Sequence, residues 1–165
     1  MSKFKSGLSF LWLSAVAFCL DLFTKYLVVN HFELYESVQV LPIFNLTYVR
    51  NYGAAFSFLA DHSGWQKSFF ILLAIGISAM LVIFLAKNKA SQRLQNTAYA
   101  LIIGGALANM ADRAYHGFVV DFFDFYWQQW HYPVFNVADI AICIGAALLA
   151  IDAIKNNEKK TEKAQ

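Results

Sequence analysis

Four long apolar stretches dominate this chain and constrain its fold more than any other feature of the sequence. They cover about residues 7–29, 68–86, 94–114 and 133–154. The hydrocarbon core of a bilayer is ~30 Å thick and is crossed by about 20 mostly apolar helical residues, so each stretch is long enough for a transmembrane helix. Charged residues make up only 15% of the chain, against roughly 25% in soluble proteins. The sequence therefore predicts an all-α membrane protein with four transmembrane helices, formed by residues 1–165 as a single domain.

The positions of the basic residues predict how these four spans are oriented. Lysine and arginine collect in the cytoplasmic segments next to transmembrane helices. Basic residues precede the first span, fill the short loop between the second and third spans, and follow the fourth. They are Lys3, Lys5, Lys87, Lys89, Arg93, Lys155, Lys159, Lys160 and Lys163. We therefore expect both termini in the cytoplasm, and the segments at about residues 30–67 and 115–132 on the outer side.

The two outer segments have patterns that are unusual for ordinary loops. Aromatic residues are concentrated between Phe118 and Phe135, and amphipathic aromatic side chains collect at the headgroup level of bilayers. The stretch from Ile43 to Val49 shows a weak alternation of apolar and polar residues, which is typical of a β-strand. We therefore expect a small β or amphipathic element that rests on the outer face of the membrane.

Polar residues converge on the outer end of the predicted spans. An ionisable residue inside a bilayer costs about 2.5–3.5 kcal/mol on insertion scales, so each one is a functional candidate. These ionisable residues, together with two asparagines beside them, come from the outer half of the first span, the end of the third span, the segment that follows it, and the first turns of the fourth span. They are Asp21, Lys25, Asn109, Asp112, Arg113, Asp121, Asn136 and Asp139. The sequence has no comparable set on the cytoplasmic side.

Several of these residues also have a simpler structural interpretation. Asp21 and Lys25 lie four residues apart on one helix face and could form only an intrahelical ion pair. Asp112 and Arg113 could form an interfacial pair that ends a helix. Asp124 is expected at the interface without a chemical role. The four histidines have no metal-ligand spacing with one another, and we expect them on the surface.

Asp121 and Asp139 differ from the other carboxylates because neither has a cation nearby in the sequence. Two carboxylates brought together at a boundary between water and lipid cannot both ionise cheaply, so one pKa rises and the pair shares a proton. Aspartic proteases use such a pair, in which one carboxylate activates water and the other donates a proton. A small proton-coupled transporter would also explain buried carboxylates, although its polar residues should follow a path through the membrane. A structural membrane subunit is a third possibility.

Five segments of the chain resemble the motifs of the lipoprotein signal peptidase (signal peptidase II) family, whose members are bacterial intramembrane aspartyl peptidases. The segments occur in the family's order, from the first span to the fourth. They are DLFTK at 21–25, NYGAAF at 51–56, GGALANMADR at 104–113, VVDF at 119–122 and FNVAD at 135–139.

The resemblance implies an aspartyl endopeptidase of the bacterial inner membrane, with its active site near the periplasmic face. Such an enzyme removes signal peptides from diacylglyceryl-modified prolipoproteins and cleaves just before the lipidated cysteine. Asp121 and Asp139 would be the catalytic pair. The residues implied to bind substrate or to support the pair are Asp21, Lys25, Asn51, Gly53, Asn109, Asp112, Arg113 and Asn136.

The resemblance also implies which partners the chain has. They are lipid-modified prolipoproteins, membrane lipid and inhibitors of the globomycin type. No metal or organic cofactor is implied. The net charge of +2 is small, so charge gives no indication of a nucleic acid partner.

Overall fold

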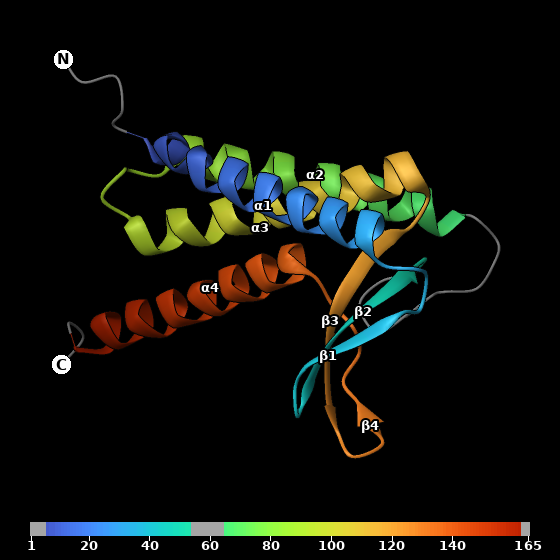
Figure 1. Ribbon diagram of the computed structural model, residues 1–165. Helices are drawn as coiled ribbons and strands as arrows, with labels where there is room; N and C mark the ends of the chain where they lie inside the picture. The colour runs from blue at the N-terminus through green and yellow to red at the C-terminus, as the bar shows by residue number, and fades with distance from the viewer. Residues whose placement is uncertain (1–5, 54–64, 163–165) are drawn as a thin grey trace.

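The computed structural model describes residues 6–53 and 65–162, which form a helical bundle with a small β-sheet at one end (Figure 1). A short 3₁₀ helix, η1 (Gly7–Phe10), leads into α1 (Leu11–His31). The other helices of the described part are α2 (Trp65–Lys87), α3 (Arg93–His116) and α4 (Val137–Glu162). The start of α1, the turn between α2 and α3, and the end of α4 lie at the end of the bundle away from the sheet (Figure 1).

The sheet joins the two segments that were predicted to lie outside the membrane. Its order is β1–β2–β3–β4 and its neighbours are antiparallel. The strands are β1 (Ser37–Leu41), β2 (Phe44–Asn51), β3 (Val119–Trp127) and β4 (Trp130–His131). The strand predicted near residues 43–49 is therefore confirmed. The aromatic segment after α3 also forms strands, so the fold is mostly helical but not all-α.

Three helices in the described residues are long and apolar enough to cross a membrane. They cover Gly7–His31, Trp65–Lys87 and Val137–Lys155, close to the predicted first, second and fourth spans. Large apolar side chains such as Trp12 and Phe23 are 62% and 57% exposed on α1. Exposed side chains of this kind on a helix suit contact with lipid.

The predicted third span is α3, which is less apolar because it lies at the centre of the bundle. It packs against α1, α2 and α4, so protein rather than lipid covers much of its surface. Small residues allow this close packing. A Cβ added at Gly104 would lie 2.6 Å from the backbone oxygen of Ser14, and one added at Gly105 would collide with the backbone oxygen of Ala138. A helix enclosed in this way does not need an apolar side chain in every direction.

A small apolar core fixes the sheet against the end of α1. Val28 at the end of α1 packs with Tyr48 of β2 and with Val120 and Phe122 of β3. Asp121, which lies between Val120 and Phe122 in the sequence, is also buried. The start of β3 is therefore held beside the ends of the helices, where the polar residues were predicted to converge.

Candidate active site

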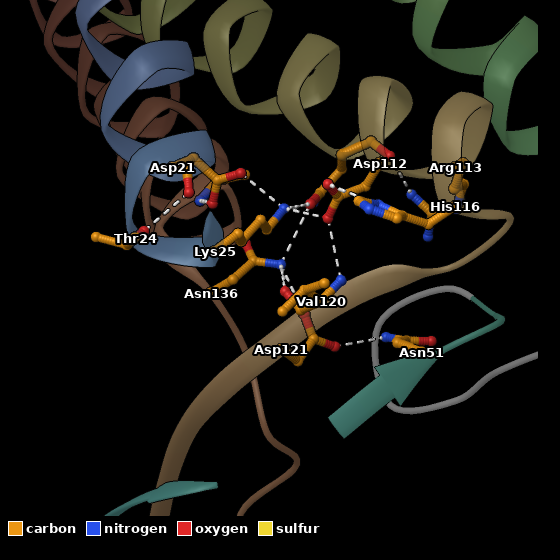
Figure 2. Close-up of polar contacts among 12 residues, drawn as sticks. Asp21, Thr24, Lys25, Asn51, Asp112, Arg113, His116, Val120, Asp121 and Asn136 are labelled. Carbon is orange, nitrogen blue, oxygen red and sulfur yellow. Dashed lines mark hydrogen bonds and ion pairs between the residues drawn. The ribbon is translucent and has the colours of Figure 1, made fainter. Parts of the chain in front are cut away.

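Asp121 lies near the start of β3, where the sheet meets the helices (Figure 2). Its side chain is 2% exposed. Its Oδ2 accepts a hydrogen bond from Asn51 Nδ2 at 2.9 Å, and its Oδ1 accepts one from Asn136 Nδ2 at 2.6 Å. In the antiparallel register Asn51 of β2 pairs with Val119 of β3. This pairing places the side chain of Asn51 within hydrogen-bond distance of Asp121.

Asp139 lies in the first turn of α4 and closes the N-terminus of that helix together with Asn136. The backbone N–H of Asp139 donates to Asn136 Oδ1 at 2.9 Å, and Asp139 Oδ2 accepts the backbone N–H of Asn136 at 3.2 Å. This reciprocal pattern is that of a capping box. The other carboxylate oxygen, Oδ1, accepts a hydrogen bond from Asn109 Nδ2 at 2.8 Å. The partly buried side chain of Asp139 is thus oriented both by its own helix and by α3.

Two amide side chains connect the aspartates to each other. Asn136 Nδ2 lies within hydrogen-bond distance of Asp121 Oδ1 and of Asn109 Oδ1, the latter at 3.2 Å. Asn109 in turn donates to Asp139. Asp121 and Asp139 therefore belong to one continuous network, although they come from a strand and a helix separated by the β3–β4 hairpin.

The ammonium group of Lys25 is buried among three acceptors (Figure 2). Its Nζ lies 2.6 Å from Asp21 Oδ2, 3.0 Å from Asp112 Oδ2 and 2.8 Å from Asn109 Oδ1. Asn109 is its hydrogen-bond acceptor, and the two aspartates are its ion-pair partners. The Asp21–Lys25 contact is therefore more than an intrahelical pair. The ion-pair contacts of Asp112 are with Lys25 and, at 3.8 Å, with His116 Nδ1, rather than with its neighbour Arg113.

Arg113 connects the loop after β2 to the helices. Its Nη2 donates to the backbone oxygen of Gly53 at 2.7 Å, and its Nη1 donates to the backbone oxygen of Asn109 at 3.3 Å. Its guanidinium carbon lies 4.9 Å from the ring centre of Phe70 in α2. Asn51 Oδ1 accepts the N–H of Gly53 at 3.0 Å, so the same loop is also tied to the residue that binds Asp121.

The environment of Asp121 makes this carboxyl group hold its proton far more tightly than usual. Burial has the largest effect and the negative charge of Asp139 the second largest, and together they raise the pKa of Asp121 to about 7. The hydrogen bonds from Asn51 and Asn136 act in the opposite direction. At neutral pH Asp121 can therefore exchange a proton readily, as general acid–base catalysis requires.

Asp124, which was expected at the interface without a chemical role, is buried within the sheet, at 3% exposed. Asp124 Oδ2 accepts hydrogen bonds from Asn45 and Thr47, and its Oδ1 lies 2.7 Å from His131 Nδ1. These contacts join β2, β3 and β4. No sequence pattern predicts the contact with His131, because it depends on how the β3–β4 hairpin turns.

His62 and the end of the NYGAAF segment, residues 54–56, lie outside the described residues. Within residues 6–53 and 65–162, no group of three or more histidine, cysteine, aspartate or glutamate side chains is arranged to hold a metal ion.

The distribution of buried charge indicates the class of protein. The buried charged side chains of the described part lie in the sheet, near the end of α3 next to it, or between the middle of α1 and its sheet end. They are Asp21, Lys25, Asp112, Asp121 and Asp124. A transport path would need such groups along the length of the bundle. A bundle with apolar helices and its buried charges gathered at one end is the arrangement of a membrane-embedded enzyme.

Comparison with known proteins identifies the particular family. The family model described as signal peptidase (SPase) II matches residues 13–155. The chain belongs to the signal peptidase II family. This membership gives no support to the transporter alternative.

Individual relatives agree with this assignment over the full length. The chain is 78% identical over 165 residues to a lipoprotein signal peptidase of Haemophilus influenzae (strain PittGG), with 100% of this chain and 96% of that protein covered. It is 72% identical to a lipoprotein signal peptidase of Pasteurella multocida (strain Pm70), with 100% of both chains covered. A solved structure described as a bacterial membrane enzyme has a TM-score of 0.84 and 31% sequence identity, with 96% of each chain covered.

Proposed function

We propose that this chain is an aspartyl endopeptidase of the bacterial inner membrane that removes signal peptides from diacylglyceryl-modified prolipoproteins. Cleavage falls just before the lipidated cysteine. Removal of signal peptides from prolipoproteins follows from the family and from full-length identity to lipoprotein signal peptidases. The observation that carries the aspartyl mechanism is the network that joins Asp121 to Asp139 through Asn136 and Asn109.

In this mechanism Asp121 and Asp139 share one proton. The raised pKa of Asp121, about 7, supports a pair that keeps a single proton at neutral pH. The ionised carboxylate takes a proton from a water molecule as the water oxygen attacks the scissile carbonyl carbon. The protonated carboxyl donates to the carbonyl oxygen. The C–N bond then breaks as the departing nitrogen takes up a proton from the pair, and a hydroxyl group of the tetrahedral intermediate returns a proton, so the pair again holds one.

The residues around the pair are assigned supporting roles. Asn136 and Asn109 hold the two carboxylates in place through their amide groups. Asn51 and Arg113 both bind Gly53, at the start of a loop that leaves the sheet beside Asp121. This location supports a role for Asn51, Gly53 and Arg113 in positioning the substrate backbone. Asp21, Lys25 and Asp112 support the site from inside the bundle.

We further propose a single domain, residues 1–165, with four transmembrane helices. The lower apolarity of α3 is compatible with this because α1, α2 and α4 pack around it. The basic residues support cytoplasmic termini, and the sheet and Asp121 then face the periplasm. The proposed spans are about residues 7–29, 68–86, 94–114 and 133–154, and the periplasmic segments are about residues 30–67 and 115–132.

A position at the membrane boundary suits a substrate that is anchored by lipid. The end of the sheet away from Asp121 exposes large apolar side chains, among them Leu41, Trp127 and Trp130, which are 55%, 68% and 65% exposed. Tryptophan is favoured where one end of a side chain is in lipid and the other in water. A diacylglyceryl group would keep the scissile bond at this boundary. Inhibitors of the globomycin type would bind the same site.

The test uses the purified full-length chain in bilayers, with one precursor supplied in diacylglyceryl-modified and unmodified forms. We expect the modified form to be cleaved far faster, to give a product that begins with the lipidated cysteine by mass spectrometry. Asp139→Asn is the matched inactive control. Failure of the wild-type chain to cleave either form would overturn the proposed function, and equal rates would overturn the role of the lipid.

A further inference from the structure

The buried charges around Lys25 are more than its ammonium group needs. Lys25 is 3% exposed and is paired with two carboxylates, Asp21 at 0% and Asp112 at 3% exposed. One carboxylate would neutralise one ammonium group, and burying a second carboxylate costs free energy. Ion pairing with Lys25 alone therefore does not account for the presence of both Asp21 and Asp112.

The second partner of Asp112 lies in β3. Asp112 Oδ2 accepts the backbone N–H of Val120 at 3.0 Å, and Figure 2 shows this contact beside Lys25. Val120 is fully buried, so its N–H needs a partner inside the protein. Val120 directly precedes Asp121. Asp112 thus holds the backbone N–H of the residue directly before one member of the aspartate pair.

The second partner of Asp21 occupies the equivalent place in α4. Asp21 Oδ1 accepts the backbone N–H of Ala138 at 2.7 Å. Ala138 is also fully buried, and it directly precedes Asp139. A carboxylate at this end of α4 also interacts favourably with the helix dipole. Asp21 thus holds the backbone N–H of the residue directly before the other aspartate.

The third contact of Lys25 reaches Asp139 by a separate route. Because Lys25 Nζ donates to Asn109 Oδ1 at 2.8 Å, the amide of Asn109 is fixed with its oxygen toward the lysine. Its nitrogen is then free to donate to Asp139 Oδ1 at 2.8 Å. One ammonium group therefore acts on both aspartates, through Asp112 on one side and through Asp21 and Asn109 on the other.

We propose that Asp21, Lys25 and Asp112 form a positioning unit that sets the separation and orientation of Asp121 and Asp139. The ammonium group clamps the two carboxylates together, and each carboxylate holds the backbone N–H of the residue directly before one catalytic aspartate. These three residues act through Val120 and Ala138 rather than by touching the substrate. The inference rests on the proposed function, since it assigns the unit a role in that reaction.

The proposal predicts an effect on the rate of the chemical step and not on substrate binding. A displacement of about 1 Å in a reacting group can lower a rate about 100-fold. Substrate affinity depends on the surface that contacts the precursor, which the positioning unit does not form. Loss of the contact to Val120 or to Ala138 should therefore lower kcat and leave KM unchanged.

The experiment compares leucine and asparagine at positions 21 and 112. Removing either carboxylate leaves Lys25 with the other one, so the buried charge stays balanced. Asparagine keeps an oxygen that can accept the backbone N–H, whereas leucine of similar size does not. We expect Asp112→Leu and Asp21→Leu to lose kcat about 100-fold at unchanged KM, and the corresponding asparagine variants to stay within about tenfold of the wild type.

Asp124→Leu is the matched control. Asp124 lies on the same strand as Val120 and is equally buried, at 3% exposed, but it binds the side chains of Asn45, Thr47 and His131. A purely structural role would give all leucine variants the same behaviour. We expect Asp124→Leu to lower the midpoint of thermal unfolding while the folded enzyme keeps its kcat within a few-fold.

The outcomes separate this inference from the proposed function. Wild-type kcat in both leucine variants, or asparagine variants as impaired as the leucine variants, would overturn the positioning unit while the proposed function stands. A precursor that the wild-type chain does not cleave would overturn both. If a leucine variant does not accumulate in the membrane, Asp112→Ala and Asp21→Ala remove the same acceptor without adding apolar bulk, and the same criteria apply to them.

Discussion

Asp121→Asn should abolish cleavage and also stabilise the folded chain above neutral pH. The pKa of Asp121 is raised to about 7 in the folded state, against about 3.9 for an unfolded chain. A carboxyl group with a raised folded pKa contributes its full stability below the unfolded pKa and loses it as the pH rises through the folded pKa. The two values differ by about three decades of proton affinity, at about 1.36 kcal/mol for each decade. Ionisation of Asp121 therefore costs about 4 kcal/mol at pH 8.

The gain from the asparagine is smaller than this cost. Asp121 accepts hydrogen bonds from the amide groups of Asn51 and Asn136, and asparagine offers only one acceptor oxygen. Loss of one of these bonds costs about 1–2 kcal/mol. The net gain should be about 2–3 kcal/mol at pH 8 and close to zero at about pH 5, where the wild-type carboxyl is already mostly protonated.

Thermal unfolding of the purified chain in detergent at pH 5 and pH 8 measures this difference. A change of about 2 kcal/mol corresponds to a shift of roughly 4–8 °C for a soluble chain of similar length, so we expect a higher midpoint for Asp121→Asn at pH 8 alone. Asp124→Asn is the control and should lower the midpoint at both pH values, because it weakens the contact with His131. A difference between Asp121→Asn and the wild type that is the same at pH 5 and pH 8 would refute the reasoning.

Three further predictions concern activity and orientation. Asp139→Asn and Asp121→Asn should each reduce cleavage to background, and the double variant should be no worse because the two residues act as a unit. At matched membrane levels the control Asp124→Asn should retain most activity. Substantial turnover by either single variant of the pair would contradict the mechanism. Asn51→Ala should move the high-pH limb of the kcat profile upward, because the hydrogen bond from Asn51 lowers the pKa of Asp121; a downward shift would count against this assignment. A cytoplasmic reporter fused after Gln165 should be active and a periplasmic one inactive, and the reverse result would invert the proposed topology.

The sequence predicts the helices well, because the length of an apolar stretch and the polar residues that end it can be read locally along the chain. It also predicts β2, because apolar and polar residues alternate weakly from Ile43 to Val49. It does not predict β3, because most of the side chains from Val119 to Asp124 are buried whichever way they point. A strand covered on both faces has no period of two, and its aromatic residues resemble those of an interfacial segment equally well.

For the candidate site, the sequence predicts which residues belong to the cluster but not which contacts they make. The membership of the cluster could be predicted, because depth in the membrane follows from distance along each span. Its internal contacts could not. Asp21 and Lys25 are close in the sequence, but the partners that distinguish Asp21 and Asp112 are the backbone N–H groups of Ala138 and Val120. Such partners depend on how helices and sheet come together, and no side-chain pattern records them.

The central position of α3 has a consequence for how the chain enters the membrane. On insertion scales polar residues such as Asn109 and Asp112 oppose the release of a single helix from the translocon into lipid. The helices α1 and α2 precede α3 in the chain and pack against it. We therefore expect α3 to partition into the bilayer in company with helices that have already been made. Biogenesis would then be cooperative, and the order in which the helices are synthesised would matter as much as the apolarity of any one of them.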